Sequence, residues 1–276
     1  MTTEPQAGPT SVEPASIFAR IICGVDGTDE SREAVAQVAR LAPETSHVTL
    51  CSVWNTGASV AVGWSPPIAR TASFPREELQ AAVDATRPLL PSSLVVDTAV
   101  VEGPPGPMLL AELGRREATL VAVGSHDHRR LSGILLGSVA TQLLHDAHCS
   151  VLMARTPNED RFPATVMVAA DGSTESAKAI RVAAEIAHRL GAELEAVVAT
   201  GGPSPVDVGA VRSVLDALGG GEVPLREDPQ PPVEALTSVG PDLLVMGSRG
   251  LQGLRSLGSI SERVAHEAEC SVLVIR

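Results

Sequence analysis

The last eleven residues of the chain nearly repeat a segment that lies 121 residues earlier: "HDAHCSVLMAR" at 145–155 and "HEAECSVLVIR" at 266–276. A second pair, "GVDGTDES" at 24–31 and "AADGSTES" at 169–176, recurs at an offset of 145. Similar segments that recur in the same order indicate a duplicated structural unit. The sequence therefore predicts two tandem copies of one domain.

Composition and spacing set the expected domain boundaries. Residues 1–17 are acidic and Pro-rich and are expected to form a flexible tail, followed by a first domain at 18–155. Residues 156–163 carry the Pro and the charges of a linker, and 164–276 form the second domain. The second copy is 22 residues shorter between its Asp-Gly turn and the glycine after its fourth apolar run.

Within each copy, apolar runs alternate with segments of helical periodicity. In the first copy the predicted strands lie at 19–26, 47–54, 94–101, 119–124 and 150–154. The predicted helices lie between them, at 29–42, 76–90, 106–116 and 137–147. Continuous apolar strands separated by amphipathic helices indicate a parallel sheet covered on both faces. Each copy is thus predicted to be a five-stranded α/β sandwich with ligands at the carboxyl ends of its strands.

Charge and cysteine usage narrow the class of partner. The formal net charge of −12 disfavours nucleic acid and anionic membranes, because phosphates would be repelled. No apolar run approaches the roughly 20 residues of a membrane span, and the N-terminus lacks a signal-peptide pattern. The four cysteines lie in apolar runs without CxxC spacing and are predicted to be free, buried thiols. These features predict a cytoplasmic protein without nucleic-acid or membrane partners.

A glycine-bounded loop follows the fourth apolar run of each copy. The loops read "GSHDHRRLSGILLGSV" at 124–139 and "GSRGLQGLRSLGSI" at 247–260. Neither contains the GxGxxG fingerprint of dinucleotide-binding folds, and the lysine of a P-loop is missing from both. Backbone N–H groups at a helix N-terminus reached through glycine can hold an anion. From the residues alone, a phosphate loop and an ordinary surface loop both remain open.

Taken together, these segments resemble the universal stress protein family. Its nucleotide-binding members carry Val-Asp-Gly-Ser after the first strand, Gly-x2-Gly-x9-Gly-Ser/Thr after the fourth, and "CPVLVV" at the end. This chain has "GVDGT", the loop at 124–139 and "HCSVLMA", then "AADGS", the loop at 247–260 and "ECSVLVI". The resemblance implies the strand order 3-2-1-4-5 of adenine nucleotide alpha-hydrolase-like folds and ATP bound across the strand ends. It also implies that two units pair through their last strands.

The resemblance also implies a role for individual residues. In the family, the aspartate after the first strand lies at the adenosine end of the nucleotide, and a residue of the second strand lies beside the adenine. The glycines and the serine of the loop lie at the phosphates. In the first copy the implied positions are Asp26, Val53, Gly124, Asp127, Gly137 and Ser138. In the second they are Asp171, Ala199, Gly247, Gly250, Gly258 and Ser259. In the first copy, Asp127 replaces the second glycine of the loop motif. In the second, the interval 251–257 has seven residues instead of nine, and Ala199 replaces the valine beside adenine.

The first copy is predicted to be the better nucleotide site, with ATP bound with or without Mg²⁺. Aspartate tolerates a left-handed turn, but a carboxylate about 5 Å from a phosphate costs roughly 1–3 kcal/mol. Arg129, Arg130 or Mg²⁺ would offset that cost. In the second copy, the loss of two residues shortens the loop by up to about 7 Å.

Three functions remain open: an ATP-binding regulatory protein, a dimeric interaction module without nucleotide, and a slow ATPase or phosphotransferase. No general base or nucleophile is evident at the phosphate end, so no catalytic residue is assigned. His126, Asp127 and His128 suggest a metal site with His145 and His148, but a helix separates the two groups by about 10 Å. No metal site is therefore predicted. By family analogy the chain is expected to form a homodimer.

The substitution Asp127→Gly restores the family motif in the first loop and tests its role. ATP binding should tighten by about 1–3 kcal/mol, roughly five- to a hundredfold, because one negative charge beside the phosphates is removed. AMP affinity should change much less, since AMP lacks the distal phosphates. Calorimetric titration of both proteins with ATP and AMP measures the difference, and equal ATP affinities would contradict a role for Asp127.

Overall fold

The computed structural model describes residues 17–55, 75–125, 136–155, 161–202, 206–218, 223–248 and 258–276. The structural statements below refer to these ranges. Nearly all of the predicted tail, and most of the predicted linker, lie outside them.

The first repeat contains five strands connected by helices, as the alternating pattern predicts. Its elements are β1 (Arg20–Gly24), α1 (Asp29–Leu41), β2 (His47–Trp54), α2 (Arg76–Thr86), the 3-10 turn η2 (Arg87–Leu89), β3 (Val95–Glu102), α3 (Pro105–Arg115), β4 (Leu120–Gly124), α4 (Ser138–Asp146) and β5 (Ser150–Ala154).

The second repeat has the same order of strands and α-helices, and among its described elements none corresponds to η2. Its elements are β6 (Thr165–Ala169), α5 (Thr174–Leu190), β7 (Glu193–Ala199), α6 (Val208–Asp216), β8 (Leu225–Asp228), α7 (Pro232–Thr237), β9 (Leu243–Gly247), α8 (Ser259–Glu267) and β10 (Ser271–Ile275). Most of the length difference falls between the second strand and the second helix, at 55–75 in the first repeat and 200–207 in the second.

Two predicted boundaries shift for local reasons. The helix expected at 76–90 ends as an α-helix at Thr86 and continues as η2, because Pro88 has no N–H to extend the α-helical ladder. The strand expected at 19–26 is shorter, at Arg20–Gly24. The chain leaves the strand there to form the turn that holds Asp26.

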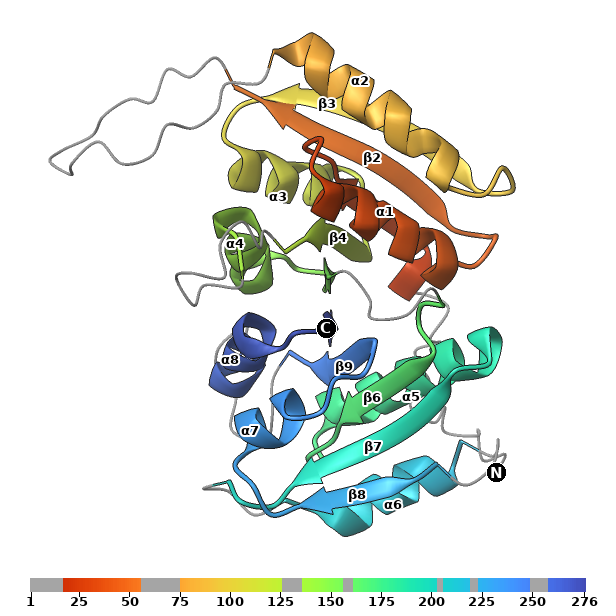
Figure 1. The fold of residues 1–276 in the computed structure, drawn as a ribbon, viewed down its shortest axis with the longest axis vertical. Coiled ribbons are helices and arrows are strands. Elements are labelled where there is room, and N and C mark those ends of the chain that lie inside the picture. The colour runs from red at the N-terminus through yellow and green to blue at the C-terminus, as the bar shows by residue number, and fades with distance from the viewer. Residues whose placement is uncertain are drawn as a thin grey trace, which may run out of the picture.

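All ten strands form one sheet, in the order β3-β2-β1-β4-β5-β10-β9-β6-β7-β8. Each half has the order 3-2-1-4-5, which confirms the topology that the family resemblance implies. Neighbouring strands are parallel except at the centre, where β5 and β10 run antiparallel. Their register pairs Met153 with Val272, Leu152 with Leu273, and Val151 with Val274. Pairing of the repeats through their last strands is thus confirmed, and Figure 1 shows the halves stacked about this centre.

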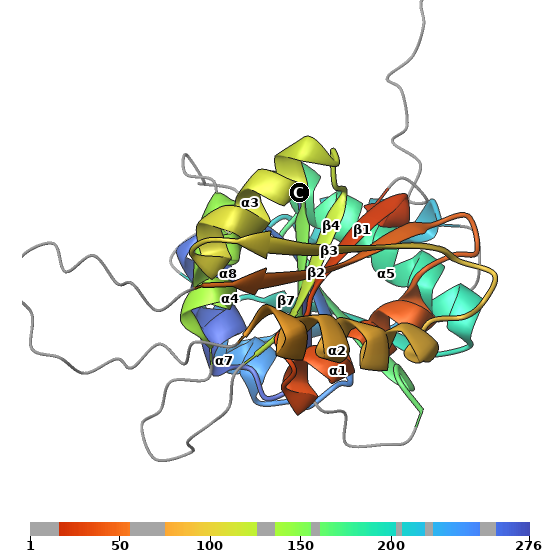
Figure 2. The ribbon, with the colours of Figure 1, turned by 90° about the horizontal axis from the view of Figure 1, so that it is seen from above.

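Helices cover both faces of the sheet and enclose two apolar cores. One core lies under α1, α2, α5 and α6, with Val35, Val83, Ile180 and Val211 among its buried residues. The other lies under α3, α4, α7 and α8. Figure 2 shows α3 on one side of β2 and β3, and α1 and α2 on the other. With few aromatic residues in the chain, aliphatic side chains fill these cores, as expected for a sheet buried on both faces.

A reciprocal pair of arginines fastens the two repeats at the central strands. Arg155, directly after β5, is 9% exposed and donates to the carbonyls of Ala265 (2.6 Å) and Cys270 (2.9 Å). Arg276, directly after β10, donates to the carbonyls of Leu144 and Ala147. Each guanidinium therefore binds a carbonyl in the last turn of the last helix of the other repeat, a group that a helix leaves without an internal partner, and a second carbonyl just after that turn.

The substitution Arg155→Met tests how much this contact stabilises the fold. It leaves two carbonyls without their donor, so the free energy of unfolding should fall by about 2–4 kcal/mol. Arg212→Met is the matched control, because the Arg212 side chain is 59% exposed and its ion pair is with the exposed Glu227; its effect should stay within about 0.5 kcal/mol. Urea denaturation measures both, and equal effects would contradict a structural role for Arg155.

Candidate functional site

The two aspartates of the repeated motif lie in turns at the carboxyl ends of β1 and β6. Asp26 Oδ1 accepts hydrogen bonds from the backbone N–H (3.0 Å) and the hydroxyl (2.6 Å) of Thr28. Asp171 Oδ1 accepts from the backbone N–H of Ser173 at 2.9 Å. Each aspartate is half-buried and shapes its own turn.

The glycine after each aspartate is required by the backbone. Gly27 has φ of 86° and Gly172 has φ of 85°, a left-handed conformation that other residues adopt only with strain. The Asp-Gly pair is therefore a turn motif in its own right, which explains why it recurs in both repeats.

The first glycine of each loop allows a helix to approach the strand end. A Cβ on Gly124 would lie 2.5 Å from the carbonyl carbon of Glu30, and one on Gly247 would lie 2.9 Å from Cβ of Glu175. Both contacts are with the first turn of the helix that follows the Asp-Gly turn, α1 or α5. Gly124 and Gly247 thus place the start of each loop against the start of that helix.

The helices that follow the two loops begin without a side-chain cap. Gly137 and Gly258 are the N-caps of α4 and α8, and among the described residues neither helix has a side-chain cap hydrogen bond. By contrast, Thr28 and Ser173 cap α1 and α5 through their hydroxyls. An uncapped helix N-terminus presents backbone N–H groups and the positive end of the helix dipole, which together can bind an anion.

The two uncapped helices differ in charge and in loop geometry. The first turn of α4 contains no acidic residue, whereas that of α8 contains Glu262. In the second repeat the loop ends are also tied together, since Gly258 N–H donates to the carbonyl of Ser248 at 2.7 Å. A negative charge and an engaged N–H make the start of α8 the weaker anion site.

The adenine-side positions also differ between the repeats. Val53 is half-buried near the end of β2, and the chain beyond Asn55 leaves the described ranges until residue 75. Ala199 ends β7 and is 9% exposed. Directly after it, Thr200 N–H donates to Asp228 O (2.7 Å) and Gly201 N–H donates to Gln230 O (3.2 Å).

The backbone of the second repeat also crowds its aspartate turn. A Cβ on Gly172 would lie 3.0 Å from both Cβ and the carbonyl oxygen of Asp207, the N-cap of α6. In the first repeat, the one described atom that a Cβ on Gly27 would meet within 4 Å is Ala82 Cβ, at 3.5 Å. In the second repeat the start of α6 therefore packs against the aspartate turn and brings the Asp207 side chain next to it.

The structure brings most of the predicted positions of the first repeat to one sheet edge. β1 pairs with β2 and β4, so Asp26, Val53 and Gly124 follow or end neighbouring strands. Gly137 and Ser138 begin the helix after the loop. Asp127 and Gly250 lie outside the described ranges, and so do His126, His128, Arg129 and Arg130.

The four thiols are buried and take no part in this edge. Cys23, Cys51, Cys149 and Cys270 are free and buried, which confirms the expectation from their sequence context. Burial raises the pKa of Cys23 and Cys51 to about 12, and that of Cys149 and Cys270 to about 11. Thiols with these pKa values stay protonated at neutral pH and are poor nucleophiles.

His145, in α4, and His148, just after it, do not form a metal site within the described part of the chain. His145 Nε2 lies 3.1 Å from Glu262 Oε1, so His145 contacts the second repeat. Over the ranges that the structure describes, no group of three or more His, Cys, Asp or Glu residues is arranged to hold a metal.

The fold and site define a class of protein: a duplicated α/β sandwich with a glycine-bounded loop at the strand ends of each repeat. The chain belongs to the universal stress protein family, whose family model matches residues 18–155 and 225–276. A universal stress protein of Mycobacterium bovis is 31% identical over 291 aligned residues, which cover 93% of this chain and 96% of that protein. A second, from Mycobacterium tuberculosis, is 29% identical over 298 aligned residues with the same coverage.

A solved structure of similar length supports the fold. A universal stress protein from Archaeoglobus fulgidus superposes with a TM-score of 0.67 at 18% identity, covering 94% of this chain and 97% of that one. A universal stress protein solved in complex with cAMP matches 49% of this chain and 95% of its own, at 21% identity and a TM-score of 0.36.

Among the helices in the described ranges, none has the length and hydropathy needed to span a membrane.

Burial of the thiols predicts slow chemical modification. In the native protein at pH 8, a disulfide reagent such as Ellman's reagent should react with the cysteines far more slowly than with free cysteine. In denaturant all four thiols should react. Absorbance of the released thiolate measures both, and one fast-reacting thiol in the native state would contradict the burial.

Proposed function

We propose that this universal stress protein is an ATP-binding regulatory protein whose nucleotide site lies in the first repeat. The observation that carries the proposal is the uncapped N-terminus of α4, which begins at Gly137 and Ser138 without an acidic residue in its first turn. Backbone N–H groups there would hold phosphates. Asp26 and Val53, at the ends of β1 and β2, would lie toward the adenosine.

The second repeat is proposed to act mainly as the structural partner of the first. The two ends of its glycine-bounded loop are joined by the hydrogen bond from Gly258 N–H to the carbonyl of Ser248. Its aspartate turn packs against Asp207. Glu262 adds a negative charge to the first turn of α8. Each of these features opposes a bound triphosphate, so a single nucleotide per chain is expected.

We propose binding without rapid turnover. Asp26 already shapes its turn through Thr28, and the four buried thiols are protonated at neutral pH. Mg²⁺ would enter with the phosphates of ATP and offset part of the negative charge of Asp127. A homodimer and a cytoplasmic location also remain proposals, and the mass of the protein in solution by light scattering tests the first of them.

The substitution Gly137→Asp tests the site without removing the helix. Gly137 has φ of −71° and ψ of 161°, which aspartate adopts readily. Its carboxylate would cap the N–H groups of α4 and repel phosphate, so ATP affinity should fall at least about tenfold. Helix stability should be unchanged or raised by a few tenths of a kcal/mol.

The matched variant Gly258→Asp makes the same change in the second repeat, where the backbone is also extended (φ −79°, ψ 148°). It should leave ATP affinity within about twofold of wild type. Calorimetry measures binding, and thermal unfolding checks the fold of each variant. Loss of affinity in Gly258→Asp alone would move the site to the second repeat. No ATP binding by the wild type would overturn the proposal in favour of an interaction module, and steady release of phosphate would favour an ATPase.

A further inference from the structure

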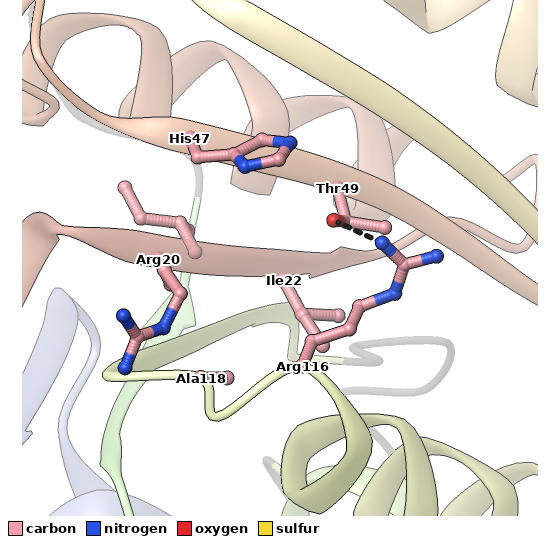
Figure 3. A pocket seen from close by; sticks show the side chains of 7 residues that line it. Arg20, Ile22, His47, Thr49, Arg116 and Ala118 are labelled. Carbon is pink, nitrogen blue, oxygen red and sulfur yellow. Dashed lines mark hydrogen bonds between the residues drawn. The ribbon is translucent and has the colours of Figure 1, made fainter.

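A cavity opens at the amino ends of β1 and β2, at the opposite edge of the sheet from the nucleotide site proposed above. Its volume is about 190 Å³, several times what a water molecule needs. Figure 3 shows Arg20, His47 and Arg116 arranged around it, with Ile22 and Ala118 between them. The cavity therefore combines an apolar floor with three basic side chains. It is lined by Arg20, Ile21, Ile22, His47, Thr49, Arg116 and Ala118.

The three basic groups come from three different elements. Arg20 begins β1 and His47 begins β2, and the parallel register places these two residues side by side. Arg116 is the C-cap of α3, and its NH1 donates to the hydroxyl of Thr49 at 3.2 Å. Guanidinium groups match carboxylates and phosphates in both geometry and charge.

Arg116 is held in place by a buried carboxylate. The side chain of Glu112 is 8% exposed, and its Oε2 accepts from Arg116 Nε at 3.0 Å. Its Oε1 accepts from Arg115 Nε at 2.9 Å. Hydrogen bonding to Arg115 also lowers the pKa of Glu112, which keeps this carboxylate charged. One edge of the Arg116 guanidinium is thus anchored to Glu112 while another reaches Thr49 on the cavity wall.

The other two acidic neighbours are exposed. Asp97 Oδ2 lies 3.0 Å from His47 Nε2 and 3.6 Å from Arg116 NH1, with its side chain 51% exposed. Glu117 Oε2 lies 3.5 Å from Arg20 NH2, and the Glu117 side chain is 80% exposed. Exposed pairs at these distances contribute little stability, so an anion in the cavity can compete for Arg20 and His47 at small cost.

The second repeat shows that the fold does not require these basic residues. The same strand register pairs Thr165 with Glu193 where the first repeat pairs Arg20 with His47. Glu195 occupies the position of Thr49, and the C-cap of α7 is Ser238 where that of α3 is Arg116. Two arginines near the end of α3 also complement its helix dipole, but Arg20 and His47 lie on strands and have no such role.

We propose that this cavity binds a small organic anion, with its carboxylate or phosphate group held by Arg20, His47 and Arg116. The apolar part of the ligand would lie on Ile22 and Ala118. The cavity is confined to the first repeat and lies apart from the uncapped end of α4, so the proposal does not depend on nucleotide binding.

The test is a titration with succinate and with inorganic phosphate, matched in ionic strength with sodium chloride. In ¹⁵N-labelled protein, the Nε–H signals of Arg20 and Arg116 should shift with saturation, while chloride alone should cause no saturable shift. Tighter binding of succinate than of phosphate would assign the site to carboxylates, and the reverse would assign it to phosphates. Shifts that grow linearly with either anion would overturn the proposal.

Two variants that each remove one positive charge distinguish direct contact with the anion from the effect of net charge on anion binding. Arg20→Gln should weaken binding about tenfold or more, because it removes a charge-assisted contact. Arg212→Gln removes one exposed positive charge from the second repeat and should change affinity less than about twofold. Gly137→Asp should bind as wild type does, which excludes the start of α4 as the source of the signal. Equal weakening by Arg20→Gln and Arg212→Gln would overturn the proposal, provided thermal unfolding shows both variants folded. If Arg20→Gln fails to fold, His47→Gln serves in its place under the same criterion.

Discussion

The antiparallel pairing of β5 with β10 is the contact on which the rest of the molecule depends. It is the only antiparallel contact among the described strands, and it joins two parallel half-sheets into one sheet of ten. The strands are buried over their whole length, so their backbone groups need partners. Arg155 and Arg276 extend this contact into the helix layer, where each binds carbonyls of the other repeat. Without Arg155 and Arg276, the carbonyls that these side chains bind near the ends of α8 and α4 would lose their hydrogen-bond donors.

Much of this architecture could be predicted from the sequence because the duplication provides each signal twice. The strands, the order of the sheet and the central pairing follow from repeated apolar runs and from the family motifs. The arginine pair was missed, although both repeats end in "CSVL" followed three residues later by Arg. An arginine directly after a strand is usually expected to be exposed. Only the pairing of β5 with β10 in the structure shows that Arg155 is buried.

The site could be predicted only in part, for a physical reason. Gly124 and Gly247 fit a phosphate-loop motif, yet the structure shows that each is also required where a helix packs against a strand end. A sequence motif does not separate these two causes. The cavity of the first repeat was not predicted at all, because Arg20, His47 and Arg116 are far apart in the chain. Only the register of β1 with β2 and the end of α3 bring them together.

Covalent fusion of the two repeats has a consequence for how such a protein can evolve. In a dimer of identical chains every substitution appears on both sides of the symmetry axis, so a change that closes one pocket closes both. Here the pairing partner is in the same chain, its effective concentration is fixed by the connection, and dilution does not separate the halves. Each half is therefore free to change alone. The packing of Asp207 against Gly172 in the second repeat, and the basic residues Arg20 and His47 in the first, are two differences between halves that have the same strand order.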